Sequence, residues 1–385
     1  MITPKTKPHR ASTICGLVLC LFIAGGKSWS QGISGVRLFG RVVDDSTKGP
    51  IVNANVFLAN TMIGASSDSS GTFDIKNVPA GYHELVASCV GYYMSTTRIE
   101  LRAGEGMKIE MRLRPKEVRL GVVEVTAAQP EEWKENLKAF SRLLLGLTPE
   151  ASACRFINPE VLDFSTDLYG RFHARADKVI IIENPALGYR LHLSLGAFSF
   201  DGRWLSSVFK VRYEEVQPPD PDALPRWQKA RDEVYSGSLH HFLVALVNGD
   251  LADDGFAMYN AETLGKAIGD APMYELKGHD IVRQSGTNKW AVSFRNYLVV
   301  TYDQKEIEME PGQAYPDWRG RFRDANPRRR RTRPQISILA LTKDSLLVDS
   351  RGQILDQLAL KVSGDWGKEG LARALPVEFQ PKAKK

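Results

Sequence analysis

The sequence has 385 residues, of which 43% are apolar and 25% charged, and these values exclude a fibrous or predominantly disordered protein. The length predicts two or three domains, each able to bury a core. Of the 51 basic residues, residues 1–30 hold four, together with no acidic residue, so the remainder carries 47 basic against 45 acidic residues. The bulk charge therefore gives no indication of a nucleic-acid partner.

The first 30 residues have the pattern of a secretory signal peptide. Lys5, Lys7 and Arg10 precede an apolar run over residues 11–26, and Ser28-Trp29-Ser30 offers small residues for cleavage before Gln31. The run is shorter than the roughly 20 apolar residues of a membrane span, and no later segment reaches that length. We expect export to the periplasm or the outer-membrane surface, with no transmembrane segment in the mature chain.

Residues 34–115 alternate short apolar strands with turn residues. Strands are expected over residues 36–43, 53–58, 72–75, 83–90, 94–101 and 107–113, separated by clusters such as Asp68-Ser69-Ser70-Gly71 and Val78-Pro79-Ala80-Gly81. Alternation predicts that Ala54, Val56 and Leu58 share one face. Strands at this spacing with Gly and Pro between them predict a β-sandwich.

Several motifs in this part resemble the carboxypeptidase-like regulatory domain. They are, in order, Phe39-Gly40-Arg41-Val42-Val43-Asp44, Pro50 to Val56, Ser70-Gly71-Thr72-Phe73, Val78 to Tyr82 and Ser88-Cys89-Val90-Gly91-Tyr92. The resemblance implies a seven-strand, transthyretin-like Greek-key sandwich without catalysis of its own. In that family the domain stands beside peptidases and before TonB-dependent receptors.

Residues 116–129 form the expected linker. Within it, residues 118–127 resemble the segment that precedes the plug of TonB-dependent receptors, which suggests an extended strand for a partner's sheet edge. The alternative is that this segment is the last strand of the sandwich running into a linker. An accessory role in TonB-dependent uptake depends on the first interpretation.

Residues 130–381 predict a second, β-rich α+β domain, so that the whole chain is mainly β. Trp133, Leu137, Phe140 and Leu144 recur at helical spacing over residues 130–145. Further helices are expected over 226–235, 238–247 and 368–375, and strands over 179–182, 189–195, 197–200, 208–213, 273–302 and 336–362.

The second domain also resembles an exported family from Gram-negative bacteria that are rich in TonB-dependent receptors. The segments that carry this resemblance are Asn158 to Phe164, Ile182 to Tyr189, Tyr235 to Leu243 and Leu375-Pro376. No activity is assigned to that family, so the resemblance implies none here.

Enzyme signatures are missing from the sequence. It contains no His-Glu-x-x-His, no Gly-x-Ser-x-Gly, no P-loop and no dinucleotide fingerprint, so we predict no enzyme, no catalytic residue, no metal site and no cofactor. The acidic turn at residues 248–254 lacks the calcium-loop spacing and is interpreted as a helix end. Of the adjacent histidines His240 and His241, one is expected to pack and the other to face solvent.

Six residues form a candidate binding pocket for a carbohydrate or peptide. They come from two consecutive helices and a neighbouring strand turn: Asn184, Tyr189, Trp227, Arg231, Tyr235 and His241. The same residues could equally form the seam at which the helices dock on a sheet. A competing function, a hydrolase in the second domain, would use Asp163, Glu183 or His241 and requires that they converge.

A second candidate site is the basic cluster Arg328, Arg329, Arg330 and Arg331, framed by prolines. It would suit an anionic partner such as lipid phosphate or an acidic polysaccharide, or it is a solvated loop. Cys89 and Cys154 leave open either one disulfide or two free thiols. The function that these patterns favour is a non-catalytic binding or scaffolding protein of the cell envelope, whose partner is an envelope protein or glycan.

Overall fold

The computed structural model describes residues 35–116, 130–202, 205–263, 273–308 and 332–382. These residues form a mainly β protein with five α-helices among them, as the sequence predicts. The segment expected to be a signal peptide, the expected 116–129 linker except Lys116, and the Arg328–Arg331 cluster lie outside the described residues.

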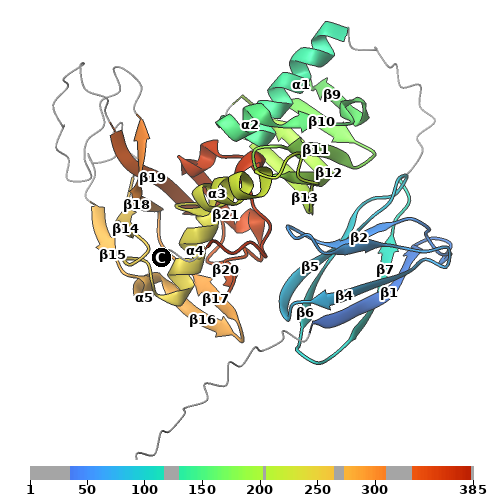
Figure 1. The fold of residues 1–385 in the computed structure, drawn as a ribbon, viewed down its shortest axis with the longest axis horizontal. Coiled ribbons are helices and arrows are strands. Elements are labelled where there is room, and N and C mark those ends of the chain that lie inside the picture. Colours follow the sequence, from blue (N-terminus) through green and yellow to red (C-terminus); the bar gives the residue numbers. More distant parts are fainter. Residues whose placement is uncertain (1–34, 117–129, 203–204, 264–272, 309–331, 383–385) are drawn as a thin grey trace, which may run out of the picture.

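The N-terminal part is the expected seven-strand sandwich, drawn in blue in Figure 1. One sheet has the order β4-β1-β7 and the other β3-β2-β5-β6. All pairings are antiparallel except that of β1 with β7, which is parallel. The strands are β1 (Val36–Asp44), β2 (Asn55–Leu58), β3 (Gly64–Ser66), β4 (Thr72–Val78), β5 (Gly81–Ser88), β6 (Ser95–Leu101) and β7 (Met107–Leu113).

The sandwich core follows the alternation of its strands. Ala54, Val56 and Leu58 are fully buried on one face, as expected. The motif glycine Gly40 lies where β1 passes β7, and a β-carbon there would be 1.7 Å from the Ile109 carbonyl oxygen. A glycine is therefore required at this motif position because the backbones approach so closely.

The next part is a six-stranded sheet covered by helix α1 (Pro130–Leu145). Its order is β8-β11-β12-β10-β9, with β13 paired to β12. Phe140 and Leu144 of α1 pack in one core with Ile182 and Leu191 of the sheet. The elements are α2 (Pro149–Ala153), β8 (Arg155–Phe156), the 3-10 turn η1 (Pro159–Val161), β9 (Leu162–Thr166), β10 (Phe172–Ala176), β11 (Ile180–Asn184), β12 (Tyr189–Phe200) and β13 (Leu205–Glu215).

Helices α3 (Ala223–Tyr235) and α4 (Leu239–Asn248) lead to the last part, which has its own core. Phe242 and Leu246 of α4 pack there with Trp366, between sheets β15-β14-β18-β19-β21 and β16-β17-β20. The remaining elements are β14 (Phe256–Ala261), β15 (Met273–Leu276), α5 (Gly278–Ile281), β16 (Val282–Gly286), β17 (Lys289–Val292), β18 (Tyr297–Glu308), β19 (Thr332–Leu341), β20 (Leu346–Asp349), η2 (Gln357–Ala359), β21 (Leu360–Gly364), η3 (Trp366–Lys368) and η4 (Leu371–Arg373).

The sandwich is packed against the second part of the chain. Phe57 and Val86, on the outer face of β2 and β5, form a buried cluster of their own. Lys210 of β13 donates to Glu84 of β5 at 2.7 Å, with only 10% and 22% of the two side chains exposed. A parallel bridge joins Thr61 to Arg212 and extends the edge of the six-stranded sheet. The outer face of this sandwich sheet is therefore an internal contact.

The C-terminal segment reinforces this packing. The Val377 amide donates to the Asn60 carbonyl at 2.9 Å, and the Met62 amide donates to a Glu378 carboxylate oxygen at 3.0 Å. The Lys382 amide donates to Asp232 of α3 at 3.2 Å. The segment thus connects the sandwich to α3.

Two local predictions need correction. The helix expected over residues 368–375 is instead the end of η3 and the turn η4, because Gly370 between them has φ +59° and lies against the Leu145 backbone. The two strands expected over 189–200 are one strand with a bulge at Gly196. Cys89 and Cys154 are both free thiols.

Candidate functional site

Four of the six candidate pocket residues come together where α3 docks on the turn between β11 and β12. The Trp227 indole donates to the Pro185 carbonyl at 2.9 Å, and the Asn184 amide group donates to the Ala372 carbonyl at 2.8 Å. Both partners are backbone groups of the protein. These two side chains therefore fasten neighbouring segments to each other.

Arg231 is the centre of this seam. Its guanidinium lies 3.9 Å from the centre of the Tyr189 ring and is bonded to the Leu187 carbonyl at 2.8 Å and to Glu215 at 2.7 Å. The arginine side chain is only 8% exposed. Its charge is satisfied internally by a carboxylate, carbonyl oxygens and an aromatic face. The geometry is that of the docking seam that the sequence left open as an alternative.

A cavity of about 800 Å³ runs along the outside of the seam. Asn184, Tyr189 and Trp227 contribute to it together with Glu183, Glu214 and Gln217. The Glu183 carboxylate is paired with Arg190 at 2.7 Å and lies 3.4 Å from Arg155. This cavity is therefore bordered by ion pairs that are already formed.

The other two pocket residues, Tyr235 and His241, line a separate cleft of about 980 Å³. The cleft lies between α3, the start of α4, the end of β18 and the C-terminal segment. Hydrogen-bonding groups of both charges and neutral amides surround it: Glu150, Gln228, Asp232, Asp254, Gln304, Lys305 and Lys382. Burial raises the pKa of Tyr235 to about 12, so its phenol stays protonated. The cleft offers both donors and acceptors to a polar ligand.

Both ring nitrogens of His241 are engaged. Nδ1 accepts from the Gly237 amide at 3.1 Å, which requires the neutral ring to carry its proton on Nε2. Nε2 lies 3.5 Å from the Asp254 carboxylate. This arrangement leaves no basic nitrogen directed at a ligand, so it differs from the histidine of a hydrolase, whose second nitrogen must accept a proton.

The expectation that one of the adjacent histidines faces solvent is wrong. His241 is 8% exposed, and His240 is held by a 2.6 Å contact between its Nε2 and the Arg351 carbonyl. Burial lowers the pKa of His240, which favours its neutral form. Neither histidine in the first turn of α4 is exposed, which adjacent polar residues in a sequence do not reveal.

The three residues of the hydrolase alternative do not converge. Asp163 is exposed on β9, while Glu183 lies on β11 and His241 on α4. β11 pairs with Tyr189–Leu193 of β12 and β10 with Ser199–Phe200, so Asp163, which pairs with β10, lies far along the sheet from Glu183.

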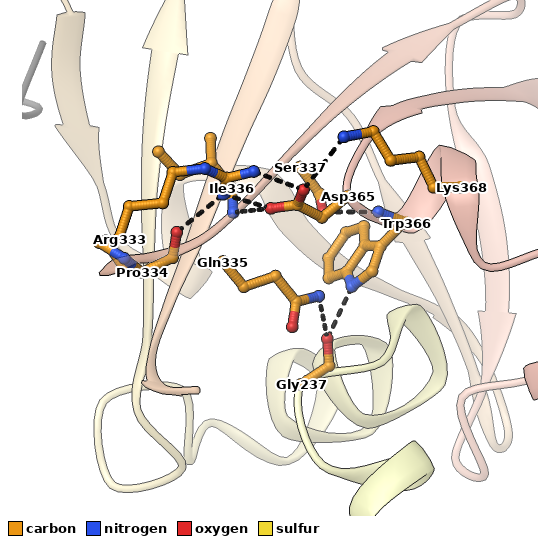
Figure 2. Close-up of polar contacts among 9 residues, drawn as sticks. All are labelled: Gly237, Arg333, Pro334, Gln335, Ile336, Ser337, Asp365, Trp366 and Lys368. Carbon is orange, nitrogen blue, oxygen red and sulfur yellow. Dashed lines mark hydrogen bonds and ion pairs between the residues drawn. The ribbon is translucent and has the colours of Figure 1, made fainter. Parts of the chain in front are cut away.

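A buried polar network fixes the turn between α3 and α4. Figure 2 shows the Gln335 side chain and the Trp366 indole both donating to the Gly237 carbonyl, at 2.8 and 2.6 Å. Gly237 has φ +74°, and a β-carbon there would lie 2.5 Å from the Tyr302 ring. Gly237, whose amide is the hydrogen-bond partner of His241, is therefore held in place by side chains of β19 and η3.

Asp365 secures the other end of the network. Burial opposes its ionisation, but the Arg333 guanidinium and the Ile336 amide outweigh burial and hold the pKa of this carboxyl below its usual value. Arg333 Nη2 donates to Asp365 at 2.6 Å, and both side chains are nearly buried. Nothing in the sequence pattern singled out Asp365, Gln335 or Lys305, because their partners are far away in the chain.

Within the described residues, no group of three or more His, Cys, Asp or Glu side chains is arranged to hold a metal ion. None of the helices in that part of the chain combines the length and apolar character needed to cross a membrane.

The chain is similar to several solved structures. A cohesin–X-dockerin complex from Acetivibrio cellulolyticus is 23% identical over 27% of this chain and 74% of that chain, with a TM-score of 0.20. A putative carbohydrate binding protein from Bacteroides uniformis is 8% identical over 69% and 88%, with a TM-score of 0.18. A DUF3823 family protein from Parabacteroides merdae is 11% identical over 46% and 80%, with a TM-score of 0.17. No curated protein matches the sequence.

The family comparison concerns the sandwich. Residues 38–125 match the CarboxypepD_reg-like domain. The match begins within β1 and covers every later strand of the sandwich. It confirms the resemblance that the sequence motifs carry: the N-terminal part of this chain is a carboxypeptidase regulatory-like β-sandwich.

Proposed function

We propose that this chain is a non-catalytic binding protein of the cell envelope, and that the cleft lined by Tyr235 and His241 takes a glycan. One observation carries the proposal. The cleft combines neutral amides, carboxylates and cations at its surface, while its histidine has both ring nitrogens occupied. Such a site can hydrogen-bond sugar hydroxyls, and its histidine is not placed to act as a general base.

The sandwich has a supporting role in this proposal. Its β3-β2-β5-β6 face is occupied by the second part of the chain, so it stabilises the cleft-bearing part. The segment required for the TonB-dependent alternative, residues 118–127, lies outside the described residues. No observation on the described residues favours that alternative.

Isothermal titration calorimetry with a defined set of peptidoglycan disaccharides and disaccharide-peptides tests the binding. Gln228→Ala and Gln304→Ala should each weaken binding by about tenfold, the value of one lost hydrogen bond of roughly 1.4 kcal/mol. Gln217→Ala, in the cavity beside the seam, is the matched control and should bind as the unchanged protein does. Equal losses in all three variants, or binding by none of the ligands, would contradict the glycan assignment.

The non-catalytic and envelope parts of the proposal have their own tests. Mass spectrometry of ligand incubated with the protein should detect no cleaved product, and any turnover abolished by His241→Gln would establish the hydrolase alternative. Expression of the full chain in a Gram-negative host should yield a mature protein beginning at Gln31 in the envelope fraction. A retained N-terminus in the cytoplasmic fraction would contradict export.

A further inference from the structure

A third cavity, of about 590 Å³, lies where the parts of the molecule meet. Its walls come from α1, β13, α4, β21 and the C-terminal segment, with Asn60 of the sandwich at one side. The lining is mostly aliphatic and aromatic, and includes Leu143, Phe209, Leu243, Val362 and Leu371. Its volume is within the range of about 300–1,000 Å³ typical of small-molecule sites, which favour such junctions.

The cavity has an apolar rim. Leu205, at the start of β13, belongs to its lining and is 41% exposed. An exposed leucine at the edge of an apolar cavity provides a surface over which a hydrocarbon chain can enter.

One cation stands between this cavity and the polar cleft. The Arg373 side chain contributes to the lining of both, although only 14% of it is exposed. Its Nε has no hydrogen-bond partner among the described residues. A nearly buried guanidinium nitrogen without an acceptor is unfavourable, so a ligand that supplies an acceptor would be stabilised there.

The carboxylate nearest to Arg373 satisfies it incompletely. Glu369 Oε1 lies 3.8 Å from Arg373 Nη1, beyond hydrogen-bond distance. Burial raises the pKa of Glu369, which weakens it as a counter-ion, and Lys305 adds a second cation close to Arg373.

From this arrangement we infer that the apolar cavity binds the hydrocarbon chain of a single-chain amphiphile, with its anionic head group paired to Arg373. The head group would be a carboxylate or a phosphate, and the chain would occupy the space bounded by α1, β13 and α4. The inference goes beyond glycan binding and does not depend on it, because Arg373 is the one described residue that lines both cavities.

Calorimetric titration of the full mature chain with decanoate, decyl phosphate and decanol, all below their micellar concentrations, tests the inference. Decanoate and decyl phosphate should each bind at least about tenfold more tightly than decanol, as expected for one charge-assisted hydrogen bond. In the series octanoate, nonanoate, decanoate, each added methylene should raise affinity by up to about fourfold until the cavity is full. Equal affinity for decanol would overturn the head-group contact, and no binding of any ligand would overturn the cavity assignment.

Two variants separate the parts of the site. Arg373→Gln should remove the preference for decanoate and leave decanol binding within about twofold, because only the charged contact is lost. Ala374→Phe, which fills the cavity, should weaken the binding of all three ligands to a similar extent. Folding of both variants is checked by circular dichroism, and the comparison of ligands on the unchanged protein remains decisive if either variant fails to fold. Decanoate binding that is unaffected by Ala374→Phe would place the ligand elsewhere.

Discussion

Arg231 is a buried cation that stabilises the fold. Its contacts to Leu187, Glu215 and the Tyr189 ring are made by groups of the protein itself. Arg231→Ala should lower the free energy of unfolding by about 2–4 kcal/mol, since it removes charge-assisted hydrogen bonds and a cation–π contact. Arg231→Lys should lower the free energy of unfolding by less than Arg231→Ala, because lysine keeps the charge but lacks the planar guanidinium group. Chemical denaturation measures both.

The matched control is on the same helix. Arg226 is bonded to Asp220 by two hydrogen bonds, but both side chains are exposed. Arg226→Ala should therefore cost clearly less than Arg231→Ala, because water screens exposed pairs. Equal costs would show that Arg231 does not act as the centre of the seam.

His83 is expected to make the stability of the protein depend on pH. Burial, and then the Arg351 charge, lower its pKa to about 4, whereas an unfolded histidine titrates near about 6.5. Between these values the unfolded chain binds the proton and the folded chain does not, so the free energy of unfolding should fall as the pH drops from about 6.5 to about 4. His83→Gln removes this share of the fall and keeps a donor for the Pro79 carbonyl.

The test compares denaturation at pH 7 and pH 4.5. His192 and His240 also have lowered pKa values, so His83→Gln should reduce the pH effect without abolishing it. His279→Gln, at an exposed histidine of α5, serves as control and should leave the profile unchanged. A His83→Gln profile parallel to that of the unchanged protein would contradict the assignment.

The residue scale also shows what sequence reasoning could and could not reach. Trp227 and Arg231 are four residues apart, so their common helix face could be predicted. The sequence could not predict whether that face contacts a ligand or the protein's own carbonyl groups, because a ligand site and a docking seam use the same aromatic and cationic side chains. Tyr235 and His241 fall in another cleft because the turn at Gly237 redirects the chain.

At the scale of elements, the turn between α3 and α4 depends on one glycine. Gly237→Ala should cost about 1–2 kcal/mol for the positive φ, and a further 1–3 kcal/mol or so because the β-carbon would overlap the Tyr302 ring. Gly249→Ala, at the end of α4, has φ +86° with nothing within 4 Å and should incur only the first cost. Thermal unfolding distinguishes the two variants, and identical shifts would show that the Tyr302 contact relaxes freely.

Elements with local signals were the predictable ones. Helix α1 begins at Pro130 and ends at Leu145, as expected, and the helix expected over 238–247 is α4, which has a Ser238 cap and a left-handed Gly249 at its end. The order of the strands within the sheets has no such local sequence signal. β20 and β21 follow one another in the sequence, yet they lie in different sheets, because their partners β17 and β19 are set by distant pairing.

At the scale of the whole molecule, the packing of the sandwich had a sequence signal that the motif comparison obscured. Val56-Phe57-Leu58 and Leu85-Val86-Ala87 are continuous apolar runs, and each is buried along its length. A strand covered on one face alternates, whereas a strand covered on both faces is apolar throughout. The runs thus indicate that β2 and β5 have a second buried face, here supplied by β13 and its neighbours.

This packing makes a prediction about the cooperativity of the molecule. Val86→Arg would place a cation in a contact that already holds Lys210 and Arg212, at a cost of about 3–5 kcal/mol for an unpaired buried charge. The inner core of the sandwich, around Leu58 and Leu85, is untouched by the change. The sandwich should therefore separate from the rest while staying folded, which gives two calorimetric transitions where the unchanged protein gives one, and a larger radius of gyration by small-angle scattering.

The control for this experiment is Val90→Arg, because Val90 follows β5 on the same domain and is 61% exposed. It should leave both the single transition and the radius of gyration unchanged. If Val86→Arg also keeps one transition and the same radius, the two parts stay together without the Phe57–Val86 cluster, and the contacts of Lys210 and of the C-terminal segment hold them. If the two transitions appear, glycan binding measured on the separated form tests whether the sandwich stabilises the cleft, since a cleft that needs this support should bind more weakly once the parts come apart.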